Sequence, residues 1–61
     1  MPDVAKTLYN LGNLHRDEYR MTEAREAYEA SLNIYRAFAK NSPAAYEPYV
    51  RHVQTNLDAL P

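Results

Sequence analysis

Cysteine and tryptophan are missing from this chain of 61 residues, and glycine occurs only once, at Gly12. Without cysteine the chain forms no disulfide and no thiolate metal site, and its two histidines alone do not complete a structural zinc site. A domain of this size buries only about 60% of the surface that its unfolded chain exposes, so its core alone gives marginal stability. The sequence therefore predicts stabilisation by close helix packing, by self-association or by both.

Neither sign of charge is in excess, and long apolar runs are absent. Seven Lys and Arg residues are balanced by eight Asp and Glu residues, which gives a net charge of −1. Nucleic-acid binding requires clustered cations, so we expect no nucleic-acid partner. No apolar run approaches the roughly 20 residues of a membrane span, and the N-terminal segment lacks the apolar region of a signal peptide. We therefore expect a cytoplasmic protein with no membrane partner.

The hydrophobic residues recur at helical spacing, and no segment alternates with the period of two that is typical of strands. The pattern predicts helices at about 3–19, 22–40 and 47–59. The chain is therefore expected to be all-α, with residues 1–61 forming a single unit.

Prolines and polar residues mark the expected helix ends. Pro2 and Asp3 suit the first turn of a helix, and Thr22 suits an N-cap position. Pro43 and Pro48 bracket a short segment before the third helix. Because a proline deep inside a helix costs about 3 kcal/mol, we expect a turn or kink over residues 43–47.

Each predicted helix carries one apolar stripe. The first consists of Val4, Leu8, Leu11 and either Leu14 or His15. The second consists of Ala24, Ala27, Tyr28, Ser31, Leu32, Tyr35 and either Phe38 or Ala39. The third consists of Tyr46, Val50, Val53, Leu57 and Leu60. These stripes are the predicted contacts between the helices.

The two ends of the chain resemble each other. Residues 1–14 align with residues 47–60 without gaps. The identical pairs are Pro2/Pro48, Val4/Val50, Asn10/Asn56, Leu11/Leu57 and Leu14/Leu60. We interpret the third predicted helix as a second copy of the first that lacks a following helix.

Small and large residues across the first two predicted helices follow a recognisable spacing. Its members are Leu8, Leu11, Gly12, His15, Ala24, Tyr28, Ser31 and Leu32. With these residues the chain resembles the tetratricopeptide repeat (TPR) family, whose motif W-x2-L-G-x2-Y…A-x3-F…P forms an antiparallel helix hairpin of about 34 residues. The second helix continues past Arg36, the motif's terminal proline position, so the likeness is to the longer repeats of kinesin-light-chain type. The resemblance implies that Gly12 and Ala24 let the two helices approach closely.

The resemblance also implies a function, namely a non-catalytic module for protein–protein interaction. In TPR proteins the first helix of a repeat lines a concave groove that holds a peptide. The matching candidates for partner binding are Lys6, Tyr9, Asn10, Asn13, Arg16 and Asp17. Tyr9 stands where carboxylate-clamp members of the family carry lysine, so clamp-type capture of a C-terminal carboxylate is not expected. A solvated helix surface or a contact with a neighbouring repeat is the alternative interpretation of these residues.

One hairpin with one further helix is short of the three or so repeats that make a stable stack. We therefore expect a homodimer or a higher homo-oligomer, formed through leftover apolar surface or by exchange of the third helix. The spacing of polar residues predicts no enzyme activity, no cofactor and no metal. A purely architectural oligomerisation unit or an excised part of a longer repeat scaffold remains open. A helical nucleic-acid binder is a third hypothesis, and Arg51 would be its main cation in the third helix.

Overall fold

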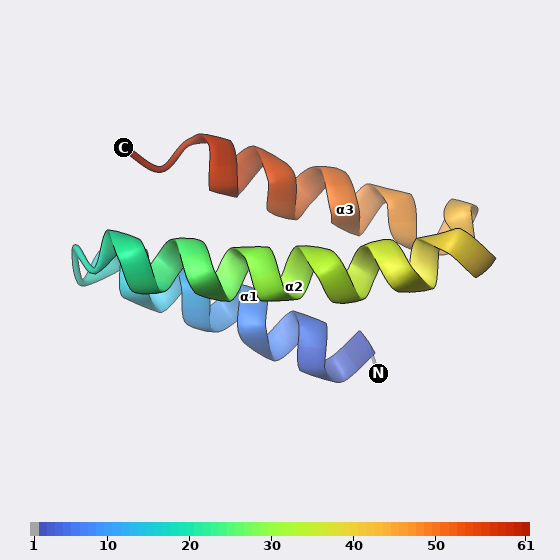
Figure 1. Ribbon diagram of the computed structural model, residues 1–61, viewed down its shortest axis with the longest axis horizontal. Coiled ribbons are helices and arrows are strands. Elements are labelled where there is room, and N and C mark those ends of the chain that lie inside the picture. The colour runs from blue at the N-terminus through green and yellow to red at the C-terminus, as the bar shows by residue number, and fades with distance from the viewer. Residues whose placement is uncertain (1) are drawn as a thin grey trace.

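Three helices make up the computed structural model, which describes the backbone of residues 2–61 and the side chains of residues 3–61. Helix α1 spans Pro2–Asp17, α2 spans Met21–Asn41 and α3 spans Pro43–Asp58, and no strand occurs in this part of the chain. The helices run antiparallel in sequence order, and α2 packs against both α1 and α3 (Figure 1). The fold is therefore all-α, a helix hairpin followed by a third helix.

Helix α2 supplies most of the core because it is covered on two sides. Its buried residues are Ala24, Ala27, Tyr28, Ser31, Leu32 and Tyr35, as its predicted stripe requires. Helix α3 adds the buried Val53, and Leu60, which lies just beyond the end of α3, is buried as well. Tyr46, Val50 and Leu57 are partly buried against the same cluster, so the predicted stripe of the third helix is also confirmed.

Helix α1 packs on α2 through small residues. Ala5 and Gly12 are both buried. The hydroxyl of Ser31 donates a hydrogen bond to the backbone carbonyl of Ala5 across a distance of 2.7 Å. This contact requires the backbones of α1 and α2 to approach closely, which small side chains permit.

The ring of Tyr28 lies directly against Gly12. A Cβ atom built at position 12 would lie 2.6 Å from Cδ1 and 2.7 Å from Cε1 of Tyr28. These distances are far shorter than a carbon–carbon contact at its optimal separation of about 3.5–4.0 Å. The Tyr28 side chain is fully buried and therefore has no open space into which it can move. The predicted close approach at Gly12 is confirmed, and the ring of Tyr28 is what occupies the space.

Most of the predicted apolar stripe of α1 is not buried against α2. Val4, Leu11 and Leu14 are 49%, 40% and 53% exposed, and Leu8 and His15 are half-buried. The prediction was wrong because spacing identifies an apolar stripe but not the element that covers it. Two helices approach most closely where their side chains are smallest. On α1 these small residues are Ala5 and Gly12, which lie beside the leucine stripe.

Of the turn or kink predicted over residues 43–47, the turn was wrong, because these residues are helical and α3 begins at Pro43 and not near residue 47. Pro43 stands at the start of the helix, where no backbone N–H is needed. Pro48 lies within the second turn, so it removes one hydrogen bond near the start of the helix. The carbonyl of Ser42 accepts hydrogen bonds that close the first turn. The partly buried residues that follow anchor the rest of α3.

The turn between α1 and α2 begins earlier than the sequence predicts and is slightly longer. Helix α1 ends at Asp17 instead of near residue 19, and α2 begins at Met21. Thr22 is therefore not the N-cap; Arg20 occupies that position without a side-chain capping bond. The turn is closed by backbone hydrogen bonds, which sequence spacing does not reveal.

The turn after α1 places Tyr19 in the left-handed backbone region, with φ at 61°. The N–H of Arg20 donates to the carbonyl of His15 at 2.8 Å, and the N–H of Tyr19 donates to that of Arg16 at 3.0 Å. This pair of bonds defines a Schellman motif, in which glycine usually occupies the left-handed position. The Tyr19 side chain is 87% exposed and adds little packing in return.

Replacing Tyr19 with glycine is expected to raise the free energy of unfolding by about 1 kcal/mol. A left-handed conformation costs a residue with a Cβ about 1–2 kcal/mol, and the greater freedom of glycine in the unfolded chain offsets part of that gain. Urea unfolding followed by circular dichroism at one fixed protein concentration measures the change. Tyr19→Ala keeps the Cβ and should show no comparable gain. A Tyr19→Gly variant no more stable than the parent would contradict this interpretation of the turn.

Candidate functional site

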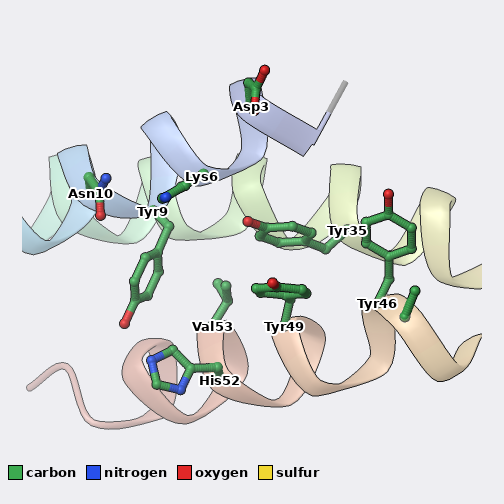
Figure 2. Close-up of a pocket in the computed structure, with 10 residues that line it drawn as sticks. Asp3, Lys6, Tyr9, Asn10, Tyr35, Tyr46, Tyr49, His52 and Val53 are labelled. Atoms are coloured by element: carbon green, nitrogen blue, oxygen red, sulfur yellow. The ribbon is translucent and has the colours of Figure 1, made fainter.

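A groove of about 550 Å³ opens between α1 and α3, with one side chain of α2 between them (Figure 2). We call it the α1–α3 groove. Helix α1 contributes Asp3, Lys6, Tyr9 and Asn10, and α2 and α3 contribute Tyr35, Tyr46, Tyr49, His52 and Val53. Tyr35 and Val53 are buried, whereas Tyr49 is 53% exposed. The groove thus combines a buried apolar base with accessible aromatic walls.

Aromatic rings contact one another along the groove. Tyr35 and Tyr49 are stacked, with ring centroids 5.1 Å apart and an angle of 10° between the planes. Tyr46 lies beside Tyr49, with centroids 6.3 Å apart. Nearer the other end, the ring of Tyr9 lies 5.4 Å from that of His52 (Figure 2). Such contacts restrict the ring orientations and so hold the walls in place before any ligand binds.

Polar side chains join α1 to α3 beyond the groove. The amide of Asn56 donates a hydrogen bond to the hydroxyl oxygen of Tyr9 at 3.1 Å. The guanidinium of Arg16 donates to the side-chain oxygen of the same Asn56 at 3.2 Å. Asn56 therefore links two residues of α1 and fixes the position of the Tyr9 hydroxyl.

The predicted partner-binding residues separate into two groups. Lys6, Tyr9 and Asn10 lie together in the α1–α3 groove. Lys6 and Asn10 are exposed, and Tyr9 is half-buried. These three residues keep the position that a partner-binding role requires.

The other three predicted residues are engaged within the molecule or lie outside the groove. Asn13 is half-buried and accepts a hydrogen bond from the hydroxyl of Tyr28. Arg16 donates to Asn56 and also lies 3.5 Å from the carboxylate of Asp17. Asn13 and Arg16 thus hold the helices together, which leaves their predicted partner-binding role without supporting geometry.

The residues that carry the TPR-like spacing occupy different depths. Gly12, Ala24, Tyr28, Ser31 and Leu32 are buried, Leu8 and His15 are half-buried, and Leu11 is exposed. The Nδ1 atom of His15 has no hydrogen-bond partner among the described residues, and it lies 3.8 Å from the carboxylate of Glu18. The buried members lie where α1 crosses α2 and along the core face of α2.

Sequence reasoning missed the contribution of α2 and α3 to the groove. Tyr35 and Tyr46 belong to predicted packing stripes, and Tyr49 and His52 lie outside them. The available signal was composition, since the chain has six tyrosines and no tryptophan. Tyrosine combines a large apolar ring with a polar tip and is typical of contact surfaces. Their convergence depends on where α3 packs, which composition does not reveal.

Burial raises the pKa of the Tyr35 hydroxyl above its ordinary value of 10.0. Neighbouring Tyr49 and Asp3 act in the same direction, because negative charge near a phenolate disfavours ionisation. The Tyr35 hydroxyl therefore remains protonated at neutral pH and serves as a hydrogen-bond donor at the base of the groove.

A second surface feature lies on α1, largely on a different side of the helix from Lys6, although Leu14 adjoins Asn10 four residues before it. We call it the open α1 face, and it comprises Val4, Leu8, Leu11 and Leu14. Three of these have identical counterparts in α3 or just after it, in the pairs Val4/Val50, Leu11/Leu57 and Leu14/Leu60. The α3 copies pack on the core, and Leu60 is only 8% exposed. The same residue types are thus covered in α3 and uncovered in α1.

No protein-family model, curated protein or solved structure matches this chain. The TPR resemblance therefore stays a prediction from sequence. Within residues 2–61, no helix has the length and apolar character required to cross a membrane. The described residues also include no group of three or more His, Cys, Asp or Glu side chains placed to hold a metal ion.

Proposed function

We propose that this chain is a non-catalytic protein-interaction module of TPR type that binds an extended peptide segment in the α1–α3 groove. The observation that carries the proposal is the convergence of Lys6, Tyr9 and Asn10 with the tyrosines of α2 and α3. Open grooves with aromatic walls and a few polar groups are the usual setting for ligand binding. Lys6 and Asn10 supply hydrogen bonds to a peptide backbone, and the aromatic rings supply contact area.

The internal bonds of the groove favour binding without large rearrangement. Tyr9 is held by Asn56, and Tyr49 is stacked on Tyr35. A wall that is already ordered loses less conformational freedom on binding, so more of the contact energy contributes to affinity. This preorganisation compensates for the modest size of a three-helix chain.

Selection of peptides from a random display library on the immobilised chain tests the proposal. Enriched peptides are expected to bind Tyr49→Ala and Asn10→Ala about tenfold more weakly than the parent chain, since both variants remove groove contacts. Asn10 is preferred to Asn13 because the latter also holds the Tyr28 hydroxyl. Glu26→Ala, at an exposed site on α2 outside the groove, is the matched control and should bind normally. Failure to enrich any peptide, or equal binding by the groove variants, would overturn the proposal.

A second candidate function, architectural self-association, is favoured by the open α1 face. We infer that two copies of the chain bury this face against each other as a homodimer. Its counterparts Val50 and Leu57 are partly buried against the core and Leu60 is buried in it, which supports the view that this stripe suits helix packing. Because Val4, Leu8 and Leu11 lie on a different side of α1 from the groove residues Lys6 and Tyr9, a dimer through this face leaves most of the groove accessible. If the sequence is part of a longer repeat scaffold, a preceding helix would occupy the same face.

A further inference from the structure

Several tyrosine hydroxyls of the α1–α3 groove have no hydrogen-bond partner in the part of the chain that the structure describes. Among residues 3–61, no hydrogen bond involves the hydroxyl of Tyr35, Tyr46 or Tyr49. The Tyr9 hydroxyl accepts a bond from Asn56, so its own proton remains free to be donated. The ammonium of Lys6 and the amide of Asn10 add further donors, whereas Asp3 is the one acceptor-only side chain among the described residues that line the groove. A ligand that fits it carries many acceptors and few donors.

The charge of the groove is balanced. Among the side chains of residues 3–61, Asp3 and Lys6 are the only formally charged ones that line it, and their charges cancel when His52 is neutral. A strongly charged ligand therefore meets as much repulsion as attraction. Charge complementarity favours an uncharged segment whose recognition rests on ring contacts and hydrogen bonds.

The length of the groove limits the ligand. Its α3 wall extends from Ala45 to Val53, which corresponds to about 12 Å along a helix that rises 1.5 Å per residue. A polyproline II segment rises about 3.1 Å per residue, so about four residues cover that distance. The groove is therefore suited to a short extended segment.

We propose that the α1–α3 groove binds a short, uncharged, proline-rich segment in the polyproline II conformation. Proline rings pack on aromatic faces, and the backbone carbonyls of this conformation have no internal partners and accept bonds from tyrosine hydroxyls. Proline has no backbone N–H, so a donor-rich groove leaves no ligand donor unpaired. The proposal rests on the peptide-binding function above and names the class of ligand.

Titration with an acetylated and amidated hexaproline peptide, followed by backbone amide chemical shifts, tests the proposal. Saturable shifts are expected for amides of α1 and α3 around the groove. A flexible neutral Gly-Ser peptide of equal length is the matched ligand control and should cause none. Hexaproline is expected to bind Tyr49→Ala about tenfold more weakly, because an exposed ring that forms part of the wall is lost. Tyr49→Phe keeps the ring and should lose about threefold, which measures the hydroxyl.

Tyr19→Ala is the protein control, because that tyrosine lies in the turn between α1 and α2, outside the groove. It should bind hexaproline normally. The absence of saturable shifts with hexaproline, or unchanged affinity in Tyr49→Ala, would overturn the proline-rich assignment. If library selection yields groove-dependent peptides without proline while hexaproline fails, the peptide-binding function stands and only the ligand class is wrong.

Discussion

Replacement of Gly12 by leucine is expected to destabilise the chain by about 3 kcal/mol or more, the upper range for overpacking a well-packed core. A Cβ atom alone would come within 2.6 Å of the buried Tyr28 ring, and leucine adds three further carbons. The ring has no exposed volume to enter, so α1 must move away from α2 and lose the Ser31 bond to Ala5. In a domain this small, each kcal/mol lowers the melting temperature by about 4 °C or more. Thermal unfolding followed by circular dichroism should therefore show a fall of at least about 12 °C.

Three controls separate close packing from other effects at Gly12. Asn10→Leu introduces the same side chain at an exposed site on α1 and should change stability by at most about 0.5 kcal/mol. Asp58→Ala alters the aligned position in the second copy, which is exposed and accepts only a bond from Gln54, and should be equally mild. Gly12→Ala adds the Cβ together with a gain of about 1 kcal/mol in helix propensity, so its loss should be smaller. An unchanged melting temperature in Gly12→Leu would refute the close-packing explanation.

A double substitution, Leu11→Lys with Leu14→Lys, is expected to convert a homodimer into a monomer. Both side chains lie on the open α1 face and are 40% and 53% exposed within one chain. Lysine is therefore tolerated in the monomer but places two unpaired charges in a dimer interface. A loss of about 3 kcal/mol from burying such groups corresponds to a dissociation constant raised by at least about 100-fold.

Sedimentation equilibrium measures this change, with circular dichroism to verify that the helices persist. Thr55→Lys introduces a lysine at an exposed site on α3 and should leave the dimer intact. Two results would contradict the self-association proposal. One is a parent chain that is a compact monomer at micromolar concentration, and the other is a double variant that still dimerises.

The secondary structure was largely predictable because helical periodicity is a local property. The stripe of α2 was predicted residue by residue from Ala24 to Tyr35, since a helix packed on two sides buries a wide apolar face. The start of α3 was not predictable in the same way. The sequence suggests breaks at Pro43 and Pro48, yet Pro43 begins the helix and Pro48 removes a single hydrogen bond in its second turn. Packing of the following turns against α2 outweighs that cost.

Of the residues that line the candidate site, only those on α1 were predicted from the sequence. Lys6, Tyr9 and Asn10 follow from the face of the first helix that the motif leaves free. Tyr46 and Tyr49 were not predicted as site residues, because their place in the groove depends on how α3 lies across α2. The same limit explains Asn13, whose helical position is consistent with partner binding but whose amide holds the Tyr28 hydroxyl.

By itself, the sequence determined that this chain forms three helices, and which face of α2 is buried, because both follow from the spacing of apolar residues along a helix. Only the tertiary structure decided which face of α1 is covered and which tyrosines meet in one groove, because these depend on how closely helices approach one another. It also decided where the chain's single glycine is needed. The crossing of α1 over α2 leaves no room for a side chain at Gly12, whereas the exposed turn at Tyr19 tolerates a left-handed tyrosine at a modest cost.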